Sequence, residues 1–367
     1  MKRIKVLMVI YALPITNGVS SYVMNYFRNL NHDAVSMDFV IYRDVETPYK
    51  EEIKSAGSRI FLLPPLRDLR AHMKAAKKVI VDGKYDIIHD NILIPSYILM
   101  FYAKKYHVPV RILHSHSPHL SGSKLKACRN RLFMPFLIHT ITNRIACSQS
   151  AALGMFHSVE DCIIVPNVVS AQKFSFDLDV RTRIRKSMKA NGKIILGSVG
   201  RLAEEKNPFF AMKSVIEARK SIPNLEYWWI GDGDLMAEVK DFITQNHATE
   251  YIKLFGNRTD IAQLYQAMDI FFLPSFFEGL PVTGLEAQAS GLPCIVSDTV
   301  SNEFVYTDLV HFFSLSKGTT GMRNILKQVM NQVHDRTAYS QNLLASKFSD
   351  QNAGKILLRI YQDSLNY

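Results

Sequence analysis

The chain has 367 residues, 47% of them apolar, which is enough for two domains of about 150 to 200 residues with a core each. Its four cysteines lack CxxC spacing, which argues against a disulfide framework or a zinc site and favours reduced thiols in a cytoplasmic protein. The net charge of +11 is uneven, because residues 1–170 hold 22 Lys and Arg against 12 Asp and Glu.

Short β-rich runs alternate with helical patterns in two series. The first series of predicted strands comprises residues 4–10, 37–42, 59–63, 86–89, 110–113, 144–147 and 162–165. The second comprises residues 194–199, 227–230, 252–255, 270–273 and 294–297. Continuous apolar strands separated by helices indicate parallel sheets covered on both faces. We therefore expect an α/β fold of two doubly wound, Rossmann-like domains.

The amino terminus begins like a signal peptide, but the apolar run is short and Pro14 ends it, so we predict a first buried strand instead. In the loop that follows, Gly18 would let the backbone approach a phosphate closely, and Ser20 is a candidate helix cap. An ordinary turn explains a single glycine equally well. The longest apolar stretch, residues 92–103, is too short to span a bilayer and predicts a buried helix.

Three histidines, His114, His116 and His119, follow a predicted strand. The alternating spacing could place His114 and His116 on one side, but no HExxH pattern or second cluster supports a metal site. Each is either a polar group facing a ligand cleft or a buried structural histidine.

A basic stretch, Lys124, Lys126, Arg129 and Arg131, runs into the apolar residues 132–138. Basic residues beside exposed apolar ones suit an anionic membrane surface, which would make the protein peripheral on the inner face of the plasma membrane. A solvated basic face is the plain alternative. A nucleic-acid partner is not expected, because no helix-turn-helix, zinc-finger or RRM signature is present.

The strand pattern is lost between residues 169 and 193, which predicts domains of residues 1–170 and 171–349. Residues 350–367 predict a final helix that could pack on either domain, including back on the first. Its apolar stripe consists of Ile356, Leu357, Ile360 and Tyr361.

Arg201 and Lys206 lie on a loop after the strand at 194–199, ahead of a helix predicted to have Asn207 as its cap and Pro208 as its first residue. The carboxyl ends of parallel strands are where doubly wound sheets bind ligands, and two cations there suit a diphosphate. The alternative is a surface loop with incidental charge.

Two further turns end strands of the second domain. The turn at 256–259, which contains Asn257 and Arg258, could hold a nucleotide base through its backbone, whereas Gly231-Asp232-Gly233 favours a structural role. The chain lacks the GxxxxGK[ST], GxGxxG and GxSxG motifs, which argues against ATP hydrolysis, nicotinamide chemistry and serine hydrolysis.

Glu278 and Glu286 stand eight positions apart around a glycine-rich turn that opens a helix. The turn and the first helical residues present backbone N–H groups suited to phosphate. Glu286, within the helix, can accept hydrogen bonds from a ribose diol, and Glu278 can reach a second hydroxylated group. A nucleotide sugar fits this order, although solvated glutamates on a strand-turn-helix remain possible.

Together these motifs resemble the retaining glycosyltransferase family 4, which has the GT-B fold with a cleft between two domains, and in particular its capsular and exopolysaccharide branch. The resemblance rests on Gly200-Arg201 with Lys206, the Gly256 turn, the run 269–275 and the Glu278-x7-Glu286 element. It implies that Arg201 and Lys206 bind the donor diphosphate, that Glu286 holds the ribose, and that His116, or His114 in the alternative register, faces the cleft. The other implied donor contacts are Gly18, Asn257, Arg258, Glu278, Gly279, Leu280, Val282, Thr283, Gly284 and Leu285.

Asn17-Gly18 stands where many relatives have a double glycine. The reaction implied is transfer of a sugar from a nucleoside diphosphate, with uridine as the expected base, to a hydroxyl of a lipid-linked glycan with retained configuration. Glu278, His116, Arg201 and Lys206 would carry it without a metal cofactor. A nucleotide-sugar epimerase of the same fold, or a non-catalytic nucleotide-sugar or polyanion-binding protein, is the alternative.

Overall fold

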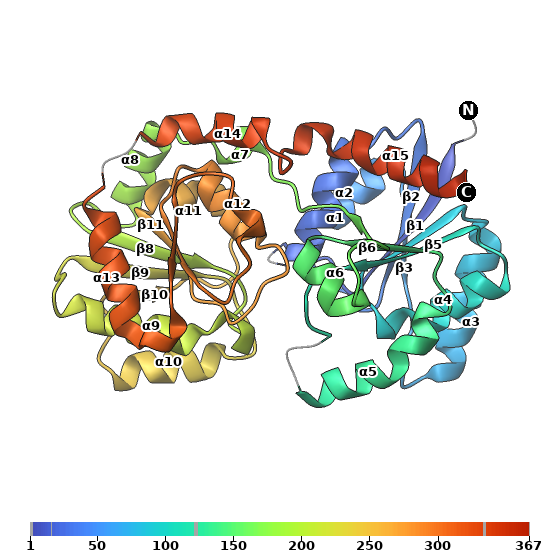
Figure 1. Ribbon diagram of the computed structural model, residues 1–367, viewed down its shortest axis with the longest axis horizontal. Coiled ribbons are helices and arrows are strands. Elements are labelled where there is room, and N and C mark those ends of the chain that lie inside the picture. Colours follow the sequence, from blue (N-terminus) through green and yellow to red (C-terminus); the bar gives the residue numbers. More distant parts are fainter. Residues whose placement is uncertain (1–2, 16, 121–123, 333–334, 367) are drawn as a thin grey trace. The chain divides into compact units, whose positions relative to one another are not determined.

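The computed structural model describes residues 3–15, 17–120, 124–332 and 335–366, and of residues 124–127 the backbone alone. The chain divides into two compact units, which are described separately (Figure 1). The first unit consists of Met1–Asn167 and Asp350–Tyr367, and the second of Val168–Ser349. The boundary expected after residue 170 lies three residues further along the chain than this division.

The described part of the first unit contains a seven-stranded sheet in which all neighbours are parallel, in the order β3-β2-β1-β4-β5-β6-β7. Its strands are β1 (Ile4–Ile10), β2 (Val35–Ile41), β3 (Ile60–Leu62), β4 (Ile87–Asp90), β5 (Val110–Ser115), β6 (Asn143–Ala146) and β7 (Ile163–Ile164). Its helices are α1 (Gly18–Asn29), α2 (Tyr49–Ser55), α3 (Leu69–Gly83), α4 (Tyr97–Lys105), α5 (Lys124–Ile138), α6 (Gln149–Phe156) and α15 (Ala353–Leu365).

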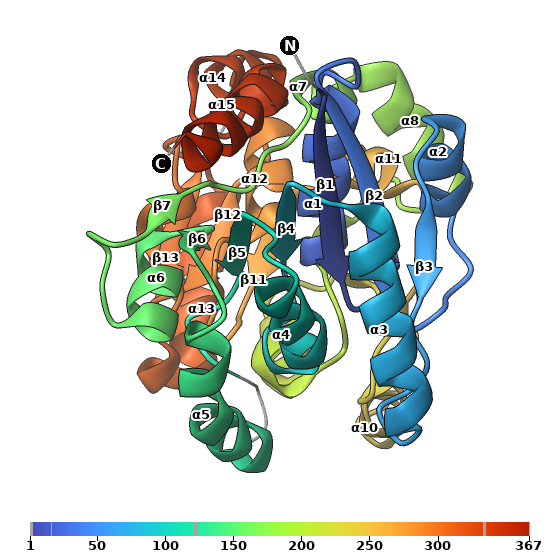
Figure 2. The same cartoon turned by 90° about the vertical axis from the view of Figure 1, so that its right-hand side faces the viewer.

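Alternate residues of this sheet face different sets of helices, as the pleat requires. Ile88 and Leu113 pack in a core with α3, α4 and α5, and Figure 2 shows α3 and α4 in front of the strands. The next residues along, His89 and His114, point to the opposite face, where Tyr361 of α15 bonds to His89. The helix predicted from residues 92–103 begins only at Tyr97, after a 3₁₀ turn at Ile94–Ser96.

The last helix, α15, packs on α1 within the first unit. A Cβ atom on Gly354 would lie 1.6 Å from the carbonyl oxygen of Asn29, so the helices approach as closely as glycine allows. Leu357 and Tyr361 of the predicted stripe are buried, but Ile356 is 39% exposed. The stripe that packs against α1 and His89 is therefore narrower than the sequence predicts.

The described part of the second unit contains a six-stranded parallel sheet in the order β10-β9-β8-β11-β12-β13. Its strands are β8 (Ile194–Val199), β9 (Leu225–Ile230), β10 (Ile252–Leu254), β11 (Ile270–Leu273), β12 (Cys294–Ser297) and β13 (Val310–Phe313). Its helices are α7 (Ala171–Phe174), α8 (Leu178–Ser187), α9 (Pro208–Arg219), α10 (Met236–Gln245), α11 (Ile261–Ala267), α12 (Val282–Ala289), α13 (Gly318–Met330) and α14 (Tyr339–Ala345).

The predicted α/β class with two parallel sheets is confirmed, and strands β1, β8, β11 and β12 have the predicted bounds. Strand β13 lacks a sequence prediction because it is an edge strand whose residues are mostly half-exposed. None of the helices in the described ranges combines the length and apolar character needed to cross a membrane.

Candidate active site

In each sheet the strands are added first on one side of the starting strand and then on its other side, so the order reverses between β1 and β4 and between β8 and β11. Most predicted site residues follow these four strands. In the second unit, Arg201 and Lys206 follow β8, and Glu278 follows the neighbouring β11. In the first unit, Gly18 follows β1, and Asn91 follows the neighbouring β4. Doubly wound sheets bind ligands at such switch points, outside the carboxyl ends of the strands.

Tight backbone packing fixes the loop that carries Arg201. A Cβ atom on Gly231 would lie 2.1 Å from the carbonyl oxygen of Gly200, and one on Gly233 would lie 2.4 Å from that of Leu202. The turn after β9 therefore has the structural role that the sequence predicts, since only glycine leaves room for the loop after β8.

Helix α9 begins at Pro208 as predicted, but Asn207 does not cap it with its side chain. Asn207 is in the left-handed region at φ 54°, and its N–H closes the 3₁₀ turn Glu204–Lys206 by donating to Glu204 O at 3.0 Å. Asn207 thus occupies the predicted N-cap position, but the extra turn holds it at positive φ, where its side chain makes no capping hydrogen bond.

Lys206 and Glu278 bind each other. Lys206 Nζ donates to both carboxylate oxygens of Glu278, at 2.6 and 2.8 Å, and the side chains are only 20% and 11% exposed. Ser275 Oγ donates to the same carboxylate at 2.6 Å. An ammonium has three donor hydrogens, so Lys206 keeps one for a further anion while Glu278 holds it in place.

Arg201 is paired more loosely. Its guanidinium donates to Glu205 at 2.6 Å, and its side chain is 50% exposed. Each of the two predicted diphosphate cations thus has a carboxylate partner, so this loop carries less excess positive charge than the cations alone suggest. An incoming anion must share or displace these partners.

Glu286 lies in the second turn of α12, where its Oε2 accepts a hydrogen bond from Tyr265 Oη at 3.1 Å. Tyr265 is fully buried in α11 and also reaches Thr283 O at 3.1 Å. Burial raises the pKa of Glu286 to about 7, although the charge of Lys173 and the tyrosine hydrogen bond oppose this shift. Tyr265 therefore orients one oxygen of the carboxylate.

The first turn of α12 presents backbone donors. The first backbone hydrogen bond of the helix runs from Gly284 N to Pro281 O, at 3.0 Å. The N–H groups of Val282 and Thr283 come before this bond and have no acceptor within the helix. Gly284 is needed for packing, because a Cβ there would lie 2.8 Å from the ring of Phe304. The predicted contacts Gly279, Leu280, Val282 and Leu285 are buried.

The turn after β10 is held by an ion pair. Arg258 donates to both oxygens of Asp260, at 2.8 and 2.6 Å, just before α11, and this contact lowers the pKa of Asp260. Asn257 is exposed beside it. Arg258 therefore stabilises the turn, and two of its guanidinium N–H groups are already used in hydrogen bonds to Asp260.

In the first unit, the cap of α1 is Asn17 rather than Ser20. Asn17 Oδ1 accepts from Val19 N at 2.8 Å and from Ser20 N at 3.4 Å, while Ser20 Oγ donates to Ala12 O. The predicted cap is wrong because the helix starts three residues earlier than Ser20 as a cap would place it. A Cβ on Gly18 would meet nothing within 4 Å, so packing leaves open space at this residue.

The side-chain amide of Asn91 fixes the protonation of His116. Its Nδ2 donates to Val9 O at 3.1 Å and to His89 O at 3.3 Å, so its Oδ1 must be the atom that faces His116 Nε2 at 2.8 Å. An amide oxygen only accepts, and His116 Nε2 therefore carries the proton. The other ring nitrogen, Nδ1, is left as an acceptor.

Three histidine rings stack behind this contact. The rings of His114 and His116 lie 4.1 Å apart, and His114 Nδ1 bonds to His89 Nε2 at 3.0 Å. His89 Nδ1 in turn bonds to Tyr361 of α15 at 2.9 Å. Burial lowers the pKa of His89 and of His116 to about 3 and also lowers that of His114, so all three rings are neutral at physiological pH. The structure thus places His116, and not His114, beside Asn91, with His114 in the buried network.

Arg336 joins the carboxyl ends of two site helices. Its guanidinium donates to Tyr265 O, Gln266 O and Met268 O at the end of α11, and to Ser290 O at the end of α12, all between 2.9 and 3.3 Å. It also stacks on Phe176, 4.3 Å from the ring centre. The two helices that carry Tyr265 and Glu286 are therefore fastened to each other at their carboxyl ends.

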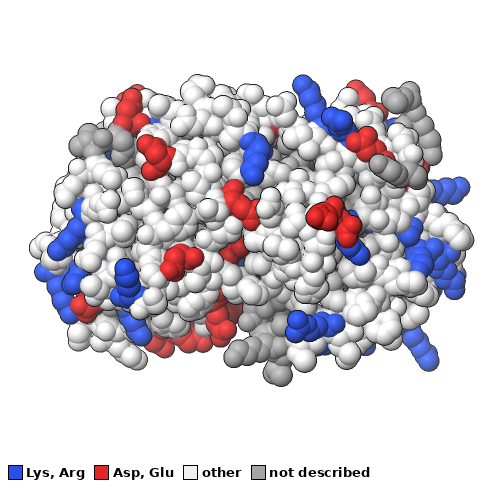
Figure 3. Space-filling view, in the orientation of Figure 1, with Lys and Arg blue, Asp and Glu red and all other residues white. Residues whose placement is uncertain are grey.

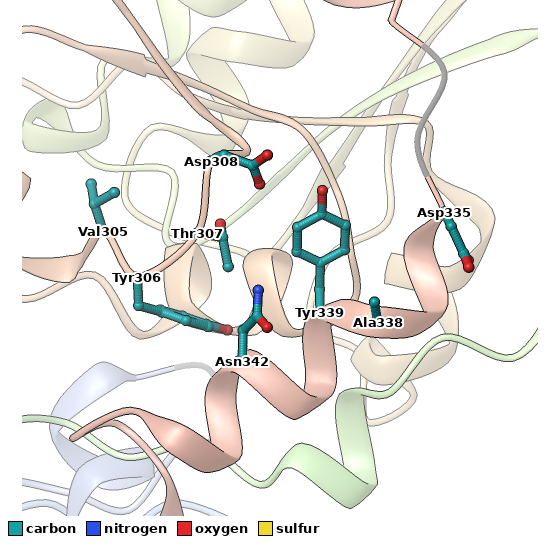
Figure 4. A pocket seen from close by; sticks show the side chains of 8 residues that line it. All are labelled: Val305, Tyr306, Thr307, Asp308, Asp335, Ala338, Tyr339 and Asn342. Carbon is teal, nitrogen blue, oxygen red and sulfur yellow. The ribbon is translucent and has the colours of Figure 1, made fainter.

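A separate pocket of about 640 Å³ lies beside α14 (Figure 4). The Tyr339 ring stands between Asp308 and Asp335, and no predicted site residue lines the pocket. The described ranges contain no group of three or more His, Cys, Asp or Glu side chains arranged to hold a metal ion.

The sequence did not predict a site role for four residues, Tyr265, Asn91, His89 and Arg336. Asn91 carried a usable signal, since it lies two residues after the strand predicted at 86–89. The others act across more than 20 positions of sequence through contacts that only the fold creates.

Comparisons with known proteins agree with this arrangement. Residues 179–318 match the family model of glycosyl transferases group 1. A Bacillus subtilis (strain 168) protein described as the glycosyltransferase EpsF is 28% identical over 363 residues, which cover 95% of this chain and 94% of that protein. The UDP-Gal:α-D-GlcNAc-diphosphoundecaprenol α-1,3-galactosyltransferase of Escherichia coli is 27% identical over 319 residues, 80% of either chain.

The crystal structure of Anabaena HepE in complex with UDP-glucose has the same fold, with a TM-score of 0.83 at 15% identity over 98% of this chain and all of that one. The expected resemblance is confirmed. The second unit carries a glycosyl transferases group 1 domain, and the chain is a glycosyltransferase of the GT-B fold that resembles enzymes of bacterial exopolysaccharide synthesis.

Proposed function

We propose that the chain is a retaining glycosyltransferase that moves a sugar from a UDP-sugar to a hydroxyl of a lipid-linked acceptor in surface-polysaccharide synthesis. The observation that carries this proposal is the pair of glutamates at the switch point of the second unit, Glu278 bound to Lys206 and Glu286 bound to Tyr265. Two oriented carboxylates beside a helix amino terminus suit the sugar, diphosphate and ribose of one donor.

Glu286 would accept hydrogen bonds from the ribose diol through its ionised form. Because the pKa of free Glu286 is about 7, the carboxylate must lose a proton to bind below neutral pH. If only the ionised form binds, affinity for UDP-glucose falls about tenfold between pH 8 and pH 6. Calorimetry across this range checks the prediction, and Glu286→Gln should give a weaker affinity that no longer changes with pH. An unchanged slope in that variant would assign the pH dependence to another group.

Lys206 would stabilise the leaving diphosphate. As the glycosidic bond stretches, negative charge develops on the diphosphate, and a preorganised cation and the N–H groups of Val282 and Thr283 favour that state. The acceptor hydroxyl would then attack from the same face, its proton passing to the departing phosphate oxygen. We propose that no metal ion takes part, because Lys206, Arg201 and the helix terminus supply the positive charge.

His116 would accept a hydrogen bond from a sugar hydroxyl through its unprotonated Nδ1. This role depends on Asn91, which keeps the proton on Nε2. A carboxylate in place of the amide would favour the imidazolium form of His116 and so raise its pKa, against the burial and the neighbouring His89 that lower it.

Asn91→Asp should therefore add an acid limb to the pH profile of kcat at saturating donor, with activity lost as the pH falls through the raised pKa of His116. The wild type, with a pKa near 3, should lack this limb above pH 5. Asn331→Asp, at an exposed position of the second unit, is the control. A uniform loss of activity at every pH would show that Asn91 acts only in packing.

The first unit carries features suited to a membrane-embedded acceptor. Figure 3 shows Lys and Arg gathered over α3, where Lys74, Lys77 and Lys78 are exposed. On α5, Leu132, Phe133 and Phe136 are 69, 44 and 57% exposed beside the exposed Arg129 and Arg131. The side chains of Lys124 and Lys126 lie outside the described residues. Apolar and basic side chains together suit an anionic bilayer.

Neutralising Lys124, Lys126, Arg129 and Arg131 should reduce binding to anionic vesicles by at least about tenfold, since each charge near the surface contributes about 1 kcal/mol. Vesicle sedimentation measures the loss, and rising salt should weaken wild-type binding in the same direction. The matched control neutralises four exposed lysines of the second unit, Lys186, Lys189, Lys213 and Lys240. Equal loss in both variants would point to net charge alone.

The direct test incubates the protein with a panel of UDP-sugars and a sugar-diphosphate-prenol acceptor in excess EDTA. Mass spectrometry should show one added sugar, and NMR should show that its anomeric configuration matches the donor. Altered donor without acceptor would favour the epimerase alternative. An inverted product would reject retention, and activity restored only by magnesium would reject metal independence.

A further inference from the structure

A groove of about 670 Å³ lies in the first unit outside the donor and sugar contacts assigned so far. Three elements form it: the loop after β5, the helix α5, and the end of α6. This volume is within the range of about 300 to 1,000 Å³ that is typical of small-molecule sites. Its lining begins at Pro118, two residues after His116, so one end of the groove adjoins the proposed sugar contact.

One part of the groove is apolar. Its apolar side chains are Leu120, Met134, Pro135, Ile138, Met155 and Phe156. At this apolar part α6 packs closely against the loop after β5, because a Cβ atom on Gly154 would lie 2.0 Å from Pro118 O. The exposed Leu132 and Phe136 continue the apolar surface on the outside of α5.

The ionisable groups of the lining give the groove a positive charge. They are Arg131, Arg144, His119, His157 and Cys128, and no carboxylate is among them. Arg144 lies over the ring of Phe156, 5.9 Å from its centre, and reaches Asp161 only at 3.6 Å. In the described ranges no carboxylate pairs with Arg131. Arg131 is thus available to a phosphate, and Arg144, whose contact with Asp161 is long, can share its guanidinium with one.

We propose that this groove binds the polyisoprenyl diphosphate part of the acceptor, with the apolar chain against Met155 and Phe156 and the diphosphate between Arg131 and Arg144. An apolar wall with two cations at its margin matches an amphiphile that has one anionic end, and neither an inorganic anion nor a neutral sugar would use both. The continuous apolar surface of α5 offers the chain a path to a bilayer. This inference rests on the proposed function, which supplies a lipid-linked acceptor.

The test measures the binding of farnesyl diphosphate below its micelle concentration, with saturating UDP present to occupy the donor diphosphate site. Met155→Trp, which fills the groove, and Arg144→Gln should each weaken binding at least about tenfold. Lys54→Gln removes a charge from an exposed position of α2 in the same unit and should leave binding unchanged. Hydrogen exchange should show protection by the ligand at residues 131–138 and 149–157.

Two further ligands show whether the diphosphate, the isoprenoid chain or both are recognised. Inorganic diphosphate at the same concentration should not displace farnesyl diphosphate, and dodecyl phosphate should bind at least about tenfold more weakly. Displacement by inorganic diphosphate would reduce the site to an anion site, and equal binding of dodecyl phosphate would reject an isoprenoid ligand. Either result overturns the inference.

The experiments distinguish a failure of the groove assignment from a failure of the proposed function. Met155→Trp should lose transfer to a prenol-linked acceptor but keep wild-type affinity for UDP-glucose. If the wild type transfers sugar and farnesyl diphosphate binds Met155→Trp unchanged, the groove assignment is wrong and the glycosyltransferase proposal stands. If farnesyl diphosphate binds as expected but no sugar is transferred to any acceptor, the proposed function is wrong instead.

Discussion

Replacing Lys206 with alanine should lower kcat/KM for the UDP-sugar by at least about 10²-fold, because the change removes a preorganised cation from the leaving diphosphate. It also leaves Glu278, which is only 11% exposed, with Ser275 as its remaining hydrogen-bond donor. Arg201→Ala should cost less, since Arg201 is half-exposed and already bound to Glu205. Steady-state kinetics and calorimetry with UDP measure both effects.

A matched control is Lys213→Ala, which removes an exposed lysine from α9 of the same unit and should leave kinetics unchanged. Combining Lys206→Ala with Glu278→Gln removes the unpaired carboxylate, so thermal stability should recover while activity stays low. If the double variant regains activity, the loss in Lys206→Ala came from the stranded carboxylate, and Lys206 is not a diphosphate contact.

Replacing Arg336 with methionine should lower the free energy of unfolding by about 2 to 4 kcal/mol. The reason is that carbonyl groups at the ends of α11 and α12 lose their shared donor, and Phe176 loses its stacked guanidinium. Urea unfolding measures the change. Arg336→Lys should recover little, because an ammonium cannot span the two helix ends as the planar fork does.

The effect should also reach the donor site. With α11 and α12 no longer fastened together, the bond from Tyr265 to Glu286 should loosen, and affinity for UDP-glucose should fall even where the protein remains folded. Lys327→Met, on the exposed side of α13, is the control for both measurements. Unchanged affinity in folded Arg336→Met would confine Arg336 to stability.

Local patterns were sufficient to predict the central strands, because fully buried parallel strands are continuous apolar runs. The candidate site residues on the loops after β8 and β11 were predictable for the same reason, since their positions follow from the ends of those strands. Helix starts were less predictable. Asn17 and Ser20 are both good caps, and only the backbone shows that Asn17 accepts the hydrogen bonds.

The partners of the predicted residues were beyond sequence reasoning. The sequence around Lys206 suggests an unpaired cation, yet Glu278, on a loop more than 70 positions away, binds it. The proton on His116 Nε2 likewise depends on how Asn91 is held by two carbonyl groups from neighbouring strands. These properties belong to side chains brought together at a sheet edge, and no local pattern encodes them.

The membership of residues 350–366 in the first unit has a consequence for synthesis on the ribosome. Tyr361 bonds to His89, and Gly354 lies against Asn29, so the first unit is completed by residues that are translated only after the whole second unit. The second unit is continuous and can fold as soon as it emerges. Until α15 is translated, the nascent first unit exposes the face of α1 that α15 covers, and a chaperone that recognises apolar surface would have its longest access there.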